Sequence, residues 1–89
     1  MNIDATDPER PLVDECLALA RARYGTPVRI SVGQAPDGMW LVDVVRDEFG
    51  FPREHRHGAK FEVQLLTERA ARRIEAFRRL QCALAARSQ

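Results

Sequence analysis

The segment from Met39 to Val45 constrains the fold most, because almost every side chain in it is apolar. Trp40, Val42 and Val44 alternate with Met39, Leu41, Asp43 and Val45. Successive side chains of a β-strand point to opposite faces, so a strand here has one wholly apolar face and one interrupted only by Asp43. Such a strand is typical of the centre of a sheet, or of a strand whose outer face meets a partner.

Two further segments alternate between apolar and polar residues and predict strands on either side of this one. They are Val28–Val32, with apolar residues at 28, 30 and 32, and Ala59–Leu65, with apolar residues at 59, 61, 63 and 65. Each pattern is typical of a strand with one buried face. Ala35-Pro36-Asp37-Gly38 predicts a tight turn before the central strand. The polar residues 47–58 predict a long loop, in which Phe49 and Phe51 are the apolar exceptions.

Helical spacing predicts one helix before the strands and one after them. The first is expected to have Thr6 or Asp7 as its N-cap and Pro8 in its first turn, and to end at Gly25. Its apolar stripe is Leu12, Val13, Cys16, Leu17, Ala20 and Tyr24. Thr67 is the expected cap of the closing helix, with Glu68 in the first turn. The stripe of that helix is Ala70, Ile74, Phe77, Leu80, Gln81 and Leu84.

The predicted order of elements is therefore helix, strand, strand, strand, helix, which is an α+β fold. Because 89 residues are enough for one hydrophobic core, we expect a single domain over residues 7–87, preceded by a flexible tail at residues 1–6. The simplest assembly is a three-stranded antiparallel meander with one or both helices packed on one face. Such a sheet has two open edges, and open edges recruit partner strands.

Composition and the N-terminal segment predict where the protein works. The hydrophobic fraction of 45% is ordinary for a globular protein. No segment approaches the roughly 20 apolar residues that cross a bilayer, and the acidic, polar start lacks the pattern of a secretory signal. We therefore expect a cytoplasmic protein that does not contact a membrane. Its two cysteines, Cys16 and Cys82, are expected to stay reduced.

The small net charge of +1 conceals an uneven distribution along the chain. Residues 1–66 hold 8 basic and 11 acidic side chains, whereas residues 67–89 hold 6 arginines and 2 glutamates. This asymmetry predicts a charged partner, such as an acidic protein surface, or self-association. An arginine-rich helix can also contact phosphates, so nucleic-acid binding is the alternative. The near-neutral total and the absence of a recognisable helix-turn-helix speak against that alternative.

The sequence offers weak candidates for metal binding and for catalysis. Glu54-His55-Arg56-His57 places two imidazoles in an HxH pattern, but a third ligand would have to come from Glu54, Asp47 or Glu48, and the nearby arginines repel a cation. A solvated polar loop is the favoured interpretation. Cys16 lies in an apolar stripe, where a thiol stays protonated, and the glycines are spaced as turn residues rather than as a phosphate loop. We predict no enzymatic activity, no catalytic residue, no cofactor and no metal site.

The middle of the chain carries a run of short motifs. They are Asp37-Gly38, the segment Trp40–Val45, the step Phe51-Pro52, and the strand Ala59–Leu65. Together, over residues 28–66, they resemble the gas vesicle protein O family, accessory proteins of gas vesicle gene clusters. Met39 stands between Gly38 and the tryptophan here, and Phe61 replaces a tyrosine. The resemblance implies a non-enzymatic helper that contacts other vesicle proteins.

These observations combine into a predicted contact surface on a protein-binding accessory or assembly factor. Its residues come from the second face of the central strand, the loop and the closing helix: Met39, Leu41, Val45, Phe49, Phe51, Arg69, Arg72, Arg73 and Arg79. The aromatic residues would supply buried anchors and the arginines orientation. A homodimer through the same surface would hide the same apolar side chains. The alternative is that Phe49 and Phe51 fold back over the core of their own domain.

Overall fold

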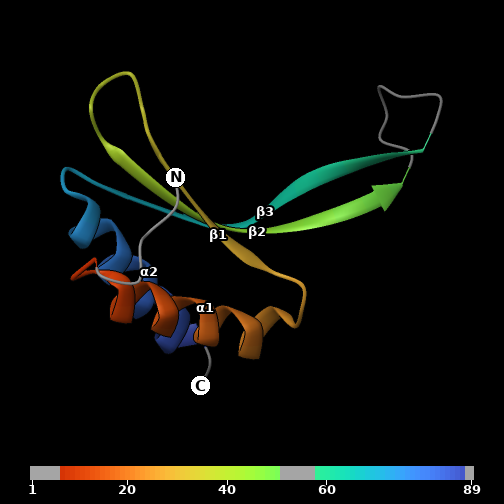
Figure 1. The fold of residues 1–89 in the computed structure, drawn as a ribbon, viewed down its shortest axis with the longest axis horizontal. Helices are drawn as coiled ribbons and strands as arrows, with labels where there is room; N and C mark the ends of the chain where they lie inside the picture. The colour runs from red at the N-terminus through yellow and green to blue at the C-terminus, as the bar shows by residue number, and fades with distance from the viewer. Residues whose placement is uncertain (1–6, 51–57, 88–89) are drawn as a thin grey trace.

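A computed structural model describes residues 7–50 and 58–87 and contains two helices and three strands. These are α1 (Arg10–Tyr24), β1 (Arg29–Gln34), β2 (Trp40–Gly50), β3 (Ala59–Ala70) and α2 (Arg73–Arg87). The strands form one antiparallel sheet in the order β1-β2-β3. The predicted α+β order of helix, three-stranded meander and helix is therefore confirmed (Figure 1).

The strand from Trp40 is the central one because its partners lie on both sides. Val32 pairs with Val42 on one side, and Glu68 pairs with Val42 on the other. The turn that precedes it is the predicted one: the Gly38 amide donates to the carbonyl of Ala35 at 2.9 Å, and Gly38 has a φ of 88°. Because L-residues rarely adopt that φ, glycine suits this position.

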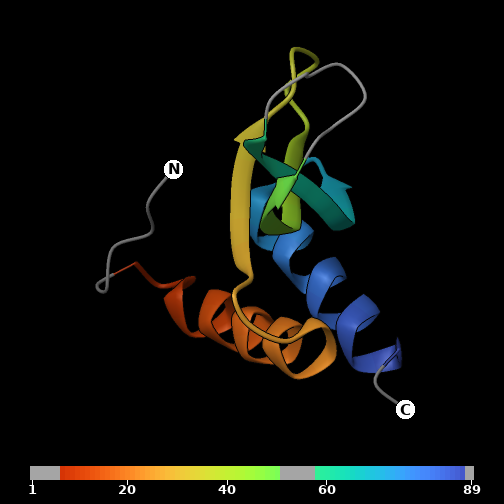
Figure 2. The ribbon, with the colours of Figure 1, turned by 90° about the vertical axis from the view of Figure 1, so that its right-hand side faces the viewer.

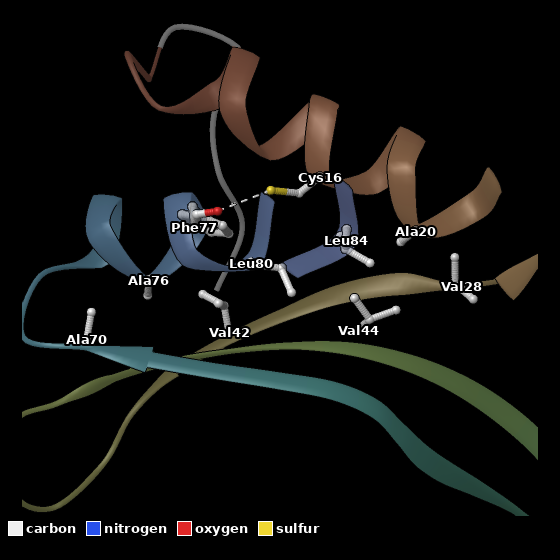
Figure 3. Close-up of a cluster of buried hydrophobic side chains, with 10 residues drawn as sticks. All are labelled: Cys16, Ala20, Val28, Val42, Val44, Ala70, Ala76, Phe77, Leu80 and Leu84. Atoms are coloured by element: carbon white, nitrogen blue, oxygen red, sulfur yellow. Dashed lines mark hydrogen bonds between the residues drawn. The ribbon is translucent and has the colours of Figure 1, made fainter. Parts of the chain in front are cut away.

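Both helices lie on one side of the sheet (Figure 1), and the face of β2 that they cover carries Trp40, Val42 and Val44. Helix α2 packs against β3 and β2, while α1 packs mainly against α2 and touches the sheet at β1. Figure 2 shows the two helices side by side beneath the strands. The core lies between the helices and the sheet (Figure 3). Its residues are Cys16, Ala20, Val28, Val42, Val44, Ala70, Ala76, Phe77, Leu80 and Leu84. The apolar stripes of the helices and the apolar face of the sheet are buried against each other, which accounts for this arrangement.

The predicted boundary between the third strand and the closing helix is wrong. Thr67 lies within β3 rather than at a helix cap, and its hydroxyl donates to Asp43 Oδ1 at 2.5 Å across the sheet. Ala70 also belongs to β3, and α2 begins at Arg73. The physical reason is that β2 offers pairing partners as far as Trp40, so the ladder continues through residues whose own preferences also suit a helix start.

Two further boundaries differ from the prediction. Residues 47–50 belong to β2 rather than to a loop, because they pair with residues 59–62 of β3. Helix α1 begins at Arg10, so Pro8 precedes it, and Asp7 accepts a hydrogen bond from the Glu9 amide at 2.9 Å in the turn before the helix. The predicted tail at residues 1–6 lies outside the described residues. Across residues 7–50 and 58–87, neither helix combines the length and the apolar character that crossing a bilayer requires.

Candidate interaction surface

The outer halves of β2 and β3 form a two-stranded arm that continues beyond the rest of the sheet. Strand β1 pairs with β2 only as far as Val45, whereas β2 and β3 pair on to Gly50 and Ala59. We call residues 46–50 and 59–63 the arm. It projects past both helices (Figure 1). A shift in the register at Val44/Val45 lies where the arm begins, and such bulges increase the local bend and twist of a strand.

Phe49 is the most exposed large apolar side chain of the arm. It lies in β2 opposite Lys60, and its side chain is 76% exposed. Among the residues that the structure describes, it is the one large hydrophobic side chain in the exposed class. Phe49 therefore does not fold back over the core, and the alternative that placed both Phe49 and Phe51 there is wrong for Phe49. A large aromatic ring on a projecting element can serve as an anchor that a partner protein buries.

The opposite face of the arm carries further apolar side chains that the sequence assigned to a buried strand face. Phe61 and Val63 are half-buried and lie outside the core cluster. The Phe61 ring lies over Gly50, where an added Cβ would be 3.4 Å from its Cε1 atom. Helices of 15 residues span about 22 Å, whereas the 12 residues of β3 span about 40 Å. The helices are therefore too short to cover the arm.

Charged side chains cross the arm on the Phe49 face. Arg29 Nη2 lies 3.4 Å from Asp47 Oδ1 and also hydrogen-bonds to Glu62, and Lys60 Nζ lies 3.6 Å from Asp47 Oδ2. Hydrogen bonding to Asp47, and then to Glu62, raises the pKa of Arg29 above its ordinary value. Such exposed pairs add little stability. They place both positive and negative charge on the same face of the arm as Phe49.

Val45 does not contribute to an open surface, so its predicted contact role is wrong. Its side chain is wholly buried, and its cross-strand neighbours are Arg29 and Gln64. The stems of such long polar side chains can cover a short valine between them. Leu41 and Met39 are half-buried. Leu41 lies eight residues from Phe49 along β2, about 27 Å at the usual rise of a strand.

The arginines of the predicted surface lie at the other end of the sheet from Phe49. Arg69 Nη2 pairs with Asp37 Oδ2 at 3.0 Å, in the turn that precedes β2. Arg79 donates to the backbone carbonyl of Arg69 at 2.8 Å, and Arg72 pairs with Glu75 at 3.3 Å. These three side chains are exposed. The structure therefore does not bring the arginines and Phe49 together in one patch.

Arg73 is committed to contacts within the domain. Its guanidinium pairs with Asp7 at 3.0 Å and with Glu9 at 2.5 Å, and it lies 5.9 Å from the centroid of the Trp40 ring. Its side chain is only 24% exposed. Arg73 thus ties the start of α2 to the segment before α1, and its predicted place on a contact surface gives way to this internal role.

Phe51, the second predicted aromatic anchor, lies outside the described residues, as does the segment Glu54–His57. Within residues 7–50 and 58–87, no three His, Cys, Asp or Glu side chains gather as metal ligands would. The described part of the surface therefore consists of Phe49 with its surrounding charges, and of Phe61 and Val63 on the reverse side of the arm.

The two cysteines lie in contrasting environments. Cys16 is buried, and its thiol donates to the Phe77 carbonyl with a sulfur–oxygen distance of 3.4 Å. Burial, with a smaller contribution from the charge of Glu15, raises the pKa of Cys16 to about 11. Cys82 is exposed on α2. Since the thiolate is the reactive form, Cys16 is unsuited to act as a nucleophile.

This contrast predicts that one thiol per native chain reacts rapidly with Ellman's reagent at neutral to mildly alkaline pH. At pH 8, about one Cys16 in a thousand carries the thiolate, and burial excludes the reagent as well. The Cys82→Ser variant should show no rapid phase until guanidinium unfolds it, and then one equivalent should react. Two rapid equivalents in the native wild type would contradict the assigned environment of Cys16.

Neither the family models, nor the curated proteins, nor the solved structures contain a match to this chain. The assignment of a site therefore depends on its geometry and chemistry.

Proposed function

We propose that this chain is a non-enzymatic protein-binding module, an accessory or assembly factor that docks on another protein through its arm. The observation that carries the proposal is the Phe49 ring, 76% exposed on a two-stranded projection. The Cys16 thiol, the buried nucleophile candidate of the core, is kept protonated. A projecting apolar anchor of this kind fits recognition of another protein.

The size of the Phe49 side chain sets what it can contribute to binding. Fully burying a phenylalanine side chain is worth about 1.5–3 kcal/mol, or about one to two powers of ten in affinity. Most of that is available here because most of the ring is exposed in the free chain. Lys60 and the Arg29–Asp47–Glu62 group, which share this face of the arm, would set the orientation of the partner.

Gas vesicle assembly is the setting that we propose for this activity, on the strength of the motifs at residues 37–45 and 59–65. An assembly helper needs a small folded body and a surface that a shell or accessory protein can engage. The arm supplies such a surface. Capture of gas vesicle proteins by the immobilised chain is the expected result, and capture of unrelated proteins alone would remove this setting while leaving protein binding in place.

The proposal is tested by affinity capture from the native host with the wild type, Phe49→Ser and Arg78→Ser. Arg78 is exposed on α2, away from the arm, and serves as the matched surface control. We expect Phe49→Ser to weaken capture of the bound protein by about tenfold or more, and Arg78→Ser to leave it unchanged. Both variants should keep the far-UV spectrum of the wild type. Equal capture by Phe49→Ser and the wild type would reject the proposal.

Nucleic-acid binding is the alternative, favoured by the exposed arginines around the start of α2. Arg69, Arg72, Arg78 and Arg79 are all exposed. Because Arg69 and Arg72 already pair with Asp37 and Glu75, their charge is partly balanced within the chain. This alternative requires retention on heparin that falls steeply with salt and is lost in Arg72→Glu/Arg79→Glu. Elution at low salt by the wild type would exclude it.

A further inference from the structure

The outer edge of β3 is an open strand edge. The order β1-β2-β3 leaves β3 with a partner on one side only, and within residues 7–50 and 58–87 no other strand pairs with it. Along the arm this edge lies beyond both helices (Figure 1). An uncovered edge presents unpaired backbone donors and acceptors that can be extended by another strand.

The part of this edge that can pair regularly with another strand is short, and its polar and apolar side chains alternate strictly. The register with β2 is unbroken from Ala59 to Gln64 and shifts beyond it, opposite Val44/Val45. Lys60, Glu62 and Gln64 share a face with Phe49. Ala59, Phe61 and Val63 occupy the other face. Any added strand therefore meets a charged face and an apolar face at once.

The charges on this edge select one register for pairing with a second copy. A two-fold axis perpendicular to the sheet keeps every side chain on its own face of the sheet. In an antiparallel pair of β3 strands related by such an axis, one residue lies opposite the same residue of the other copy, and we say that the register is centred on that residue. Centring on Lys60 or Glu62 sets like charges opposite each other. Centring on Phe61 places Lys60 opposite Glu62 twice, with apolar residues opposite one another on the reverse face. Centring the register on Ala59, Val63 or Gln64 leaves Lys60 without an acidic residue opposite it within residues 59–64.

The second edge of the arm, at residues 46–50 of β2, is less suited to self-pairing. Centring there on Asp47 or Glu48 opposes a carboxylate with its own copy, which destabilises a cross-strand pair. The β3 edge is therefore the one whose charges complement themselves.

We propose that two copies of this chain join through β3, antiparallel and centred on Phe61, to form one continuous six-stranded sheet. Lys60 faces the partner subunit's Glu62, and Glu62 faces the partner subunit's Lys60, in addition to the contacts that these two side chains make with Asp47 and Arg29 within their own chain. The two Phe61 side chains meet at the axis, and Ala59 lies opposite the partner subunit's Val63. This inference goes beyond the proposed function, because Phe49 lies one strand in from the new interface and stays available to another protein.

The test exchanges the two charges and measures the mass of the purified chain by sedimentation equilibrium. The wild type is expected to form a concentration-dependent dimer. Lys60→Glu alone opposes acidic side chains, and Glu62→Lys alone opposes basic ones, so each should weaken dimerisation by at least about tenfold. An equimolar mixture of the two variants restores every opposite-charge pair, so heterodimers should form. Far-UV spectra and melting curves show whether each variant is folded.

A cysteine pair tests the register itself in a Cys82→Ser background. Phe61→Cys should form an intersubunit disulfide under mild oxidation, because position 61 of one copy lies opposite position 61 of the other. Val63→Cys should not, because two such residues would lie about 14 Å apart along the interface. A wild type that is monomeric up to about 1 mM, or a dimer indifferent to both charge reversals, would overturn the inference. Neither result bears on the capture of another protein through Phe49. A Phe49→Ser variant that still forms dimers but captures no protein would show that dimerisation and capture use different surfaces.

Discussion

Replacing Phe77 with alanine is expected to destabilise the domain by about 3–5 kcal/mol, more than any other single substitution proposed for this chain. Among residues 7–50 and 58–87, Phe77 is the largest wholly buried side chain, and it lies in the core between α1 and the sheet (Figure 3). The substitution removes the buried apolar surface of the phenyl ring. It also leaves a cavity that two short helices cannot close. Domains have about 0.05–0.15 kcal/mol of stability per residue, so this loss is a large part of the total for a chain of this length.

Urea unfolding followed by far-UV circular dichroism measures the Phe77 effect. Phe49→Ala is the matched control, because it removes the same ring from a side chain that is 76% exposed. The control should change the free energy of unfolding by no more than about 0.5 kcal/mol. A similar loss in both variants would mean that Phe49 packs in the domain, which would also remove the basis of the proposed contact surface.

Replacing Arg73 with alanine is expected to cost about 2–3 kcal/mol of stability. The guanidinium holds Asp7 and Glu9, whose side chains are 21% and 16% exposed, and lies against Trp40. Removing it leaves two partly buried carboxylates without their cation. For a domain of this size the melting temperature should fall by roughly 10 °C or more.

Arg72→Ala is the neighbouring control for the Arg73 prediction. Arg72 is 68% exposed, lies just before α2 and pairs with Glu75 at 3.3 Å, and an exposed ion pair of this type is worth about 0.2–1 kcal/mol. Arg73→Lys keeps the charge but loses the planar fork, so it should recover only part of the stability. A double-mutant cycle of Arg73→Ala with Glu9→Gln should give a coupling energy of at least about 0.5 kcal/mol. A coupling near zero would contradict the ion pair.

The candidate site was only partly predictable from the sequence. Phe49 stands out as an aromatic residue in a polar segment, and its exposure agrees with a contact role. Phe61 and Val63 follow the same alternation as core residues, so their position outside the core cluster is not visible in the pattern. It follows from the mismatch between long strands and short helices, which emerges only when the elements are assembled.

The placement of Val45 and Arg73 shows the same limit. An alternating strand assigns Val45 to the second face, but whether that face is open depends on the side chains of the flanking strands, Arg29 and Gln64. Arg73 looks like the other arginines of the closing helix. Its partners Glu9 and Asp7 are 64 and 66 residues away in the chain, so no local pattern distinguishes it from Arg72.

The sequence by itself determined the order and type of the elements and the central place of the Trp40 strand, because periodicities of two and of about 3.6 residues and the turn Ala35–Gly38 are local properties. The tertiary structure alone decided where β3 ends, how far the arm projects, and which charges pair. Each of these depends on a partner distant in sequence: β2 extends the ladder past Thr67, and the approach of the two helix starts gives Arg73 its carboxylates. Contacts of this kind are selected by packing and electrostatics in three dimensions.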